Sequence, residues 1–214
     1  MKKIISIALA IAFPITMAFS QQITQTEKDT HSNSSAKEIK HAINSCPFAP
    51  IFGIFSVSYE YLILPNHGLV GRFDYEAVPS RFEDGGIPEN YPDAVIEASG
   101  LGFILNYRWH FSGEMESVFI GVYTRYRHFS GTGMVESTEF EFTVPEITAG
   151  LNIGKRWVWN CGLNMTVAFG YGFSKDTWES NPTNSSIEAV LKSFENSYDF
   201  FDPFYGEFSF GYAF

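Results

Sequence analysis

The sequence predicts an all-β protein, an eight-stranded antiparallel up-and-down transmembrane β-barrel, from three observations. Aromatic residues make up 17% of the 214 residues, and charged residues only 18%. Seven segments alternate apolar with small or polar side chains, as strands do when their two faces meet different surroundings. Short and long connections between these segments alternate as well, which is typical of membrane barrels with tight turns at one end.

The N-terminal residues predict export rather than a retained membrane helix. Lys2 and Lys3 precede an apolar run, and small residues stand before Gln21, so residues 1–20 have the pattern of a secretory signal peptide. Residues 21–38 are polar and lack periodicity, which predicts a flexible periplasmic tail. The barrel is expected to occupy residues 39–214, where no apolar run is long enough for a membrane helix.

The strands are expected where the alternation is regular. Single-chain barrels of this class have an even number of strands, so seven clear segments require an eighth, and only residues 39–48 leave room for it. The expected strands are residues 39–48, 55–63, 69–78, 96–111, 118–128, 146–153, 157–173 and 204–214. Short connections are expected at residues 64–68, 112–116 and 154–156, and long ones at residues 79–94, 130–138 and 174–202.

The chain ends in a strand with one aromatic face, followed directly by the C-terminus. This face consists of Phe208, Phe210, Tyr212 and Phe214. Such an ending is similar to the sorting signal by which outer-membrane barrels reach their assembly machinery. The resemblance implies that these four residues act as an assembly signal and that the machinery is a partner during biogenesis.

A soluble barrel with its apolar face inward would show the same alternation, but two features favour a membrane barrel. The polar face carries glycine and charges of both signs, which suits a narrow lumen better than a solvated exterior. Aromatic residues also gather at the strand ends next to the short connections, as in an interfacial girdle. The expected girdle is Tyr59, Tyr61, Trp109, Trp157 and Trp159.

Residues 39–214 resemble the small eight-stranded outer-membrane proteins of the OmpX and OmpW kind, and barrels of that size from Bacteroidota. The resemblance lies in the alternating segment from Phe52 to Tyr61 and in the closing Gly211-Tyr212-Ala213-Phe214. It implies a location in the outer membrane of a Gram-negative bacterium. These motifs are architectural, so they imply a fold and a location but no chemistry.

The polar face predicts a charge network inside the barrel. An eight-stranded barrel is just wide enough for its own side chains, so the network is expected to fill the lumen, with a narrow ion path as the alternative. Glu60 and Arg72 are expected to lie directly opposite each other across the hairpin centred on Asn66. The lumen set is Glu60, Arg72, Asp74, Glu76, Arg108, Arg125, Arg127, Glu146 and Glu207.

A second hypothesis is an acyl hydrolase at the outer rim. His128 and Ser130 lie two residues apart on the lipid-facing side, and Glu139 or Glu141 follows on the next strand. A serine, a histidine and an acid are the parts of an acyl-transfer site. The His-x-Ser spacing is similar to that of the lipid A deacylase PagL, although Gly131 stands where that family has Asn.

The last long connection predicts a short amphipathic helix over Ser186–Asn196. Ser185 and Glu188 have the spacing of a capping box, and an apolar stripe follows at helical spacing. This stripe must be buried on the barrel rim, on lipid or on another protein. Its residues are Ile187, Val190, Leu191 and Phe194.

The remaining features exclude several classes of site. The formal net charge of −10 disfavours nucleic acid as a partner. The histidines are scattered and Cys46 is far from Cys161, so neither a metal site nor a disulfide is expected, and no motif indicates a cofactor. The acidic residues between Pro79 and Ala94 could hold Ca²⁺, but such a loop is more often simply solvated, and that is the expectation here.

Taken as a whole, the pattern favours a non-enzymatic outer-membrane barrel with a structural or interaction role. Its loops are expected to contact lipopolysaccharide, a ligand or a larger outer-membrane assembly. The deacylase-like enzyme and a small-solute pore are the two alternatives.

Overall fold

The computed structural model describes residues 39–77, 91, 93–182, 184–198 and 203–214. The expected signal peptide, the periplasmic tail and most of the acidic loop at residues 79–94 lie outside these residues. No helix in the described part is long and apolar enough to cross a membrane.

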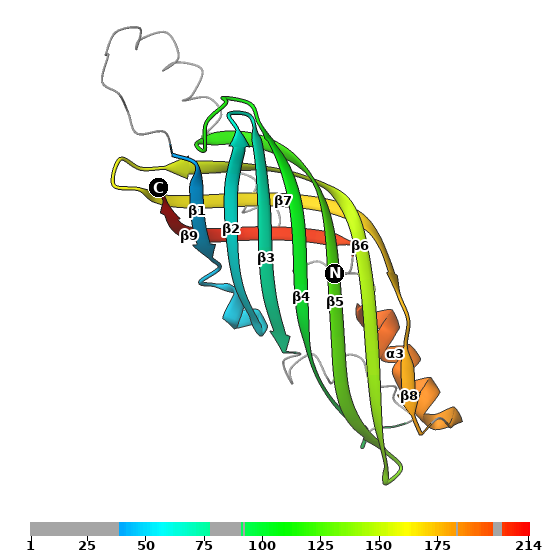
Figure 1. Ribbon diagram of the computed structural model, residues 1–214. Coiled ribbons are helices and arrows are strands. Elements are labelled where there is room, and N and C mark those ends of the chain that lie inside the picture. Colours follow the sequence, from blue (N-terminus) through cyan, green and yellow to red (C-terminus); the bar gives the residue numbers. More distant parts are fainter. Residues whose placement is uncertain (1–38, 78–90, 92, 183, 199–202) are drawn as a thin grey trace, which may run out of the picture. The chain divides into compact units, whose positions relative to one another are not determined.

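The expected barrel is confirmed: within the described residues, eight antiparallel strands close into a ring (Figure 1). Successive strands from β1 to β7 pair along the chain, and β9 pairs with both β7 and β1. The ring consists of β1 (His41–Ser45), β2 (Ile54–Leu64), β3 (His67–Ala77), β4 (Val95–His110), β5 (Ser117–Val135), β6 (Thr138–Val158), β7 (Leu163–Asp176) and β9 (Phe204–Ala213). Three further elements are η1 (Ala49–Phe52), β8 (Glu179–Asn181) and α3 (Ser185–Tyr198).

The first strand, β1, closes the ring, but it is shorter than expected. It covers five residues, and its register with β9 runs from Ala42 opposite Ala213 to Ser45 opposite Phe210. Beyond this point β9 continues without β1 beside it. Polar side chains bond to the carbonyls of this edge: Arg72 donates to Gly206 O at 3.0 Å, Arg125 to Phe204 O at 3.2 Å, and the Cys46 thiol to Phe208 O at 2.8 Å. This matters because a strand edge in lipid needs partners for its polar backbone groups.

Two of the expected connections are wrong. Residues 154–156 lie inside β6, and the chain turns instead at residues 159–162, before β7 begins at Leu163. Residues 130–138 are not a long loop, because β5 and β6 continue to a two-residue turn at Glu136 and Ser137. Both turn residues have positive φ, which is the backbone geometry of tight hairpins. The hairpin β5–β6 therefore extends well past β1, β2 and β3 (Figure 1).

Each strand of the ring places one face outward and one inward, as the alternation predicts. On β4 the side chains of Leu101 and Phe103 are 53% and 54% exposed, whereas Asn106 and Arg108 are fully buried.

Toward the β5–β6 turn, however, the polarity of the two faces of β4, β5 and β6 is exchanged. On β6 the inward Glu146 and Thr148 are followed toward the hairpin by inward Val144, Phe142 and Phe140, and the outward side chains become acidic.

Helix α3 covers the apolar inward face of this extension, so the expected helix is confirmed. Its residues Ile187, Val190, Leu191 and Phe194 are all buried, and their partners come from β4, β5 and β6. These partners include Ile96, Val135, Phe140, Phe142 and Val144. The helix therefore packs on the chain's own strands.

The helix starts differently from the expected capping box. Asn184 is the N-cap residue, because its side-chain oxygen accepts a hydrogen bond from the Ile187 N–H at 2.8 Å. Asparagine is among the favoured residues at this position, so the cap lies one residue earlier than Ser185. Strand β8 extends the β7 side of the sheet by pairing with Glu141, Phe142 and Thr143 of β6.

Candidate functional site

The charged residues of the lumen form two ion-pair clusters, which we name after their central carboxylates. The Glu60 cluster lies toward the short turns, and the Glu146 cluster lies toward the β5–β6 extension. A cluster of buried, largely apolar side chains packs inside the barrel beside the ion pairs. This cluster consists of Ile104, Phe119, Tyr123, Ala168 and Tyr205.

In the Glu60 cluster, one carboxylate accepts three hydrogen bonds while only 1% exposed. Arg108 and Arg156 both donate to Glu60 Oε2 at 2.8 Å, and Glu60 Oε1 lies 2.7 Å from His110 Nε2. The second carboxylate of the cluster, Glu207, accepts from Arg108 at 2.5 Å and from the Tyr205 hydroxyl at 2.7 Å. Two arginines thus face two glutamates, and the buried charges balance.

In the Glu146 cluster, Glu146 accepts from Arg125 at 3.2 Å, from Arg127, and from the Thr148 hydroxyl at 2.6 Å. Arg127 also reaches Glu76, at 3.5 Å. These ion pairs cross the lumen next to Val144, where the inward face of β6 becomes apolar.

The expected pairing of Glu60 with Arg72 is wrong. The strand register places Val70 opposite Glu60 and Ser58 opposite Arg72. The reason is the tight turn at Pro65 and Asn66 together with an irregularity between Leu62 and Leu64, which shifts the register relative to a regular hairpin. Arg72 instead pairs with Asp74 at 2.7 Å on its own strand.

Sequence reasoning finds nine lumen residues but misses Arg156, His110 and Tyr205 as members of the network. The sequence pattern places Arg156 in a turn, although the inward parity of β6 continues through it and it is 1% exposed. Extending the alternation along β6 would have placed Arg156 inside. His110 and Tyr205 have the inward parity of β4 and β9 as well.

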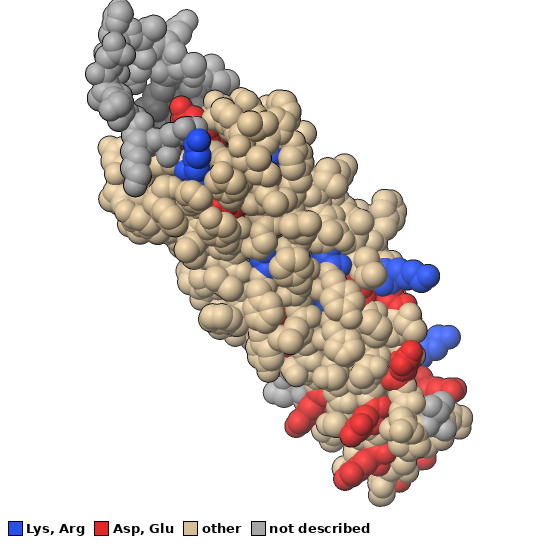
Figure 2. Space-filling model, viewed as in Figure 1, with Lys and Arg blue, Asp and Glu red and all other residues tan. Residues whose placement is uncertain are grey.

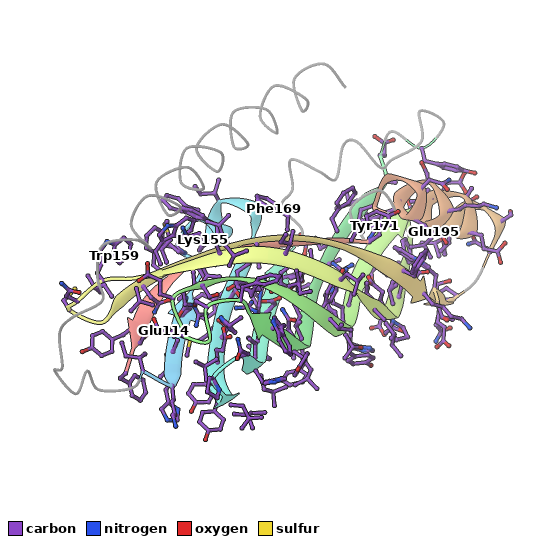
Figure 3. All side chains as sticks on the ribbon, turned by 90° about the horizontal axis from the view of Figure 1, so that it is seen from above. Glu114, Lys155, Trp159, Phe169, Tyr171 and Glu195 are labelled. Carbon is purple, nitrogen blue, oxygen red and sulfur yellow. The ribbon has the colours of Figure 1, made fainter. Side chains whose placement is uncertain are left out.

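The aromatic girdle lies at the short-turn end and faces outward. Tyr59, Tyr61, Trp109 and Trp159 are exposed, and Trp157 is half-buried. Trp159 lies in the turn after β6, at the end of the barrel opposite to Glu195 on α3 (Figure 3). Two histidines contribute to this girdle: His41 bonds the Tyr59 hydroxyl at 2.7 Å, and His67 bonds the Tyr107 hydroxyl.

The four aromatic residues of the last strand all face outward, each between 38% and 52% exposed. Phe214 stacks on His41 with ring centroids 5.4 Å apart, and its carbonyl oxygen accepts from the Lys40 and His41 N–H groups. The end of the chain is therefore held by the start of β1. Cys46 and Cys161 are both free, and Cys161 is exposed in the turn between β6 and β7.

The expected catalytic residues do not form a triad. His128 and Ser130 are exposed on β5, and the register places Ser130 opposite Thr143, with Glu141 and Glu139 still farther from the barrel. Ser130 therefore lies between His128 and both glutamates along the strands. His128 is opposite Pro145, four residues from Glu141, which corresponds to about 13 Å along the strand. A triad needs the histidine between the serine and the acid.

Ser130 and Glu141 instead border a shallow hollow of about 470 Å³ on the outward face of the extension. Glu97 and Thr132 border the same hollow. Figure 2 shows that acidic side chains gather at this end, whereas the middle of the visible face is mostly tan with a few blue patches. Among the described residues, no group of three or more His, Cys, Asp or Glu side chains is placed to hold a metal ion.

Comparison with known proteins gives neither a matching family model nor a matching curated protein. Among solved structures, the chain is similar to a major outer membrane protein from Thermus thermophilus, with 14% identity, 84% of this chain and 100% of that chain covered, and a TM-score of 0.44. It is also similar to Ail, the attachment invasion locus protein of Yersinia pestis, with 11% identity, 83% and 99% covered, and a TM-score of 0.44. For Acinetobacter baumannii CarO the identity is 12%, the coverage 86% and 99%, and the TM-score 0.41. At these values the similarities carry no functional information.

Proposed function

We propose that this protein is a non-enzymatic outer-membrane barrel that presents a rigid extension outside the cell as an interaction surface. The observation that carries the proposal is the inversion of polarity along β4, β5 and β6. Below the inversion the outward face is apolar and the inward face is charged. Above it, the outward face is largely polar, although Val95 and Met134 are exposed on it, and the inward face is covered by α3.

The lower part has the surface that a bilayer requires. Outward residues such as Leu151, Ile147 and Tyr171 are 66%, 59% and 57% exposed, and similar residues surround the ring. In water this belt would cost about 25 cal/mol for each Å² of exposed apolar surface, whereas lipid removes that cost. The girdle at the short-turn end supports a membrane interface at that level.

The filled lumen disfavours the pore alternative. The buried apolar cluster inside the barrel includes Phe119 and Ala168 at 0% exposed and Tyr123 at 1%. Glu146 also ties Arg125 and Arg127 together across β5 and β6. A solute crossing the barrel would have to displace this packing and separate buried ion pairs, which is costly. We therefore expect no steady conductance in planar bilayers.

The extension supports an interaction role because it is both polar outside and internally packed. Its outward face carries Glu97, Glu139 and Glu141, while α3 fixes the hairpin from within. A surface that is rigid before binding loses little conformational entropy when a partner binds. The partner is lipopolysaccharide, a ligand or another outer-membrane protein.

Cysteine labelling in intact cells tests the location and the orientation. In a Cys46→Ser background the natural Cys161 reports on the short turns, and Glu139→Cys with Cys161→Ser reports on the extension. A membrane-impermeant maleimide should label the Glu139→Cys variant in intact cells, and Cys161 only after the outer membrane is permeabilised. The reverse pattern, or recovery of the protein outside the outer-membrane fraction, would contradict the proposal.

Crosslinking tests the interaction itself. A thiol-linked photocrosslinker at the Glu139→Cys position should reach lipopolysaccharide or an outer-membrane protein in living cells. The same reagent on Cys161 is the matched control, since the short turns lie at the other end. Equal products from both positions, or none from the extension, would remove the interaction role.

A further inference from the structure

The shallow hollow on the outward face of the extension lies directly above the lipid-facing belt. It has a volume of about 470 Å³ and spans β4, β5 and β6 where the three strands lie side by side. The row of side chains below it contains Leu101 and His128, and the row above it contains Val95 and Met134. These larger side chains border the hollow on its lower and upper sides.

Two rows of polar side chains form the walls of the hollow. Rows two residues apart on a sheet face are separated by about 7 Å along the strands. Four of the six side chains are serine or threonine, which are shorter than those of the bordering rows, and this difference hollows the face. The upper row is Glu97, Thr132 and Glu141, and the lower row is Ser99, Ser130 and Thr143.

The floor of the hollow is held in place from the other side of the sheet. It consists of the row between the two walls, in which Gly131 lies between Ala98 and Phe142. The Phe142 ring points inward and packs against Trp178 and Phe194, with ring centroids 6.0 Å and 6.5 Å away. The walls are therefore carried by strands that α3 fixes, so a ligand meets a preformed surface.

The chemistry of the hollow disfavours anions and a single metal ion. The described residues that line it include no lysine or arginine, so it offers no positive charge to a phosphate or carboxylate. Two strand spacings, about 10 Å in all, separate the backbones of Glu97 and Glu141. A calcium ion needs its oxygen ligands within about 2.6 Å, and two carboxylates so placed do not form such a cage.

We propose that this hollow binds a neutral glycan. Sugar hydroxyls donate to the carboxylates of Glu97 and Glu141, and they exchange hydrogen bonds with the four serine and threonine hydroxyls between them. The apolar C–H face of a sugar ring packs on Val95 and Met134, which are both exposed. A simple amine would use one carboxylate and leave the hydroxyls unused. This inference rests on the interaction role proposed above and names its ligand class.

The glycan can come from two sources that share this chemistry. Leu101, in the row below the hollow, belongs to the apolar belt and is 53% exposed. The sugars of a glycolipid whose chains lie against this belt therefore reach the level of the hollow. A polysaccharide outside the cell reaches the same surface from the aqueous side.

Binding to the folded full chain in phospholipid nanodiscs tests the ligand class. The probes are dextran, mannan and the dephosphorylated carbohydrate released from lipopolysaccharide of the host bacterium. We expect saturable binding of at least one of them, which Thr132→Trp abolishes because the indole fills the hollow. Heat-modifiable migration verifies that the variant is folded. No binding of any probe, or binding that Thr132→Trp leaves unchanged, would overturn the proposal.

Two neighbouring glutamates supply a matched pair of variants. Glu141→Gln should weaken binding at least about tenfold, because a hydrogen bond to a charged group is stronger than one to a neutral group. Glu139→Gln makes the same change one row above the hollow and should leave the affinity unaltered. Equal effects of the two changes would contradict a glycan in the hollow. Displacement of the bound sugar by millimolar calcium chloride or spermidine would replace the glycan with a cation.

Intact lipopolysaccharide in the same nanodiscs distinguishes the two sources. Binding at least tenfold tighter than that of the released carbohydrate identifies a glycolipid, and equal binding identifies a free glycan. The test also separates this inference from the interaction role. A protein crosslinked at Glu139→Cys, with no sugar bound, would remove the glycan and leave the role. Labelling that places the extension on the periplasmic side would remove the role, whatever the hollow binds.

Discussion

Removing the charge of Glu60 should destabilise the barrel more than any other single charge removal in the Glu60 cluster. This carboxylate is 1% exposed and bonds Arg108, Arg156 and His110 at 2.7–2.8 Å. In Glu60→Gln, two buried arginines face only Glu207. Breaking a buried pair by removing one partner costs about 3–5 kcal/mol. With a urea dependence of about 1–3 kcal/mol per molar, the unfolding midpoint should fall by about 1 M or more.

The double variant Glu60→Gln with Arg156→Met shows whether the loss comes from charge imbalance. It returns the cluster to one arginine and one glutamate, so it should be at least about 1 kcal/mol more stable than Glu60→Gln alone. Glu139→Gln makes the same chemical change on the exposed extension and should stay within about 0.5 kcal/mol of the unaltered protein. Reversible unfolding in lipid vesicles, followed by tryptophan fluorescence, measures all three. A Glu60→Gln midpoint equal to that of the unaltered protein, or a double variant no better than the single one, would refute the reasoning.

Four further outcomes are expected. Leu191→Asp should expose α3 to protease while the heat-modifiable barrel persists, whereas Lys192→Asp on the exposed helix face should not; loss of the barrel itself would show that the extension is not separable. Leu151→Arg in the apolar belt should cost about 2–4 kcal/mol in vesicles, against little for Glu141→Arg on the extension; equal costs would argue against lipid at Leu151. Deleting Phe214 should reduce the folded fraction in the outer membrane without affecting export, and normal amounts of folded protein would count against an assembly signal. Ser130→Ala should leave the acyl composition of lipid A unchanged by mass spectrometry, and a change that depends on Ser130 would restore the deacylase hypothesis.

The fold and the lumen were predictable because both depend on local alternation. The strand period of two assigns each residue to a face, so the inward position of Glu60, Arg108 and Glu146 follows from parity alone. The apolar stripe of α3 follows from its helical spacing in the same way. Both patterns can be recognised from neighbouring residues in the sequence, without knowing which strands pair. The membership in a Bacteroidota lineage, by contrast, stays a prediction.

The partners of these residues depended on the tertiary structure. An irregularity near Leu62 moved Arg72 away from Glu60, and Arg156 reached Glu60 from β6 because the barrel closes. Residues of the same parity also have different surroundings along β6. Phe142 and Glu146 both point inward, but Phe142 packs against α3, whereas Glu146 forms ion pairs with arginines. A period of two says which face a side chain occupies. What covers that face is decided by register, by strand length and by ring closure, which are long-range properties that local sequence patterns do not encode.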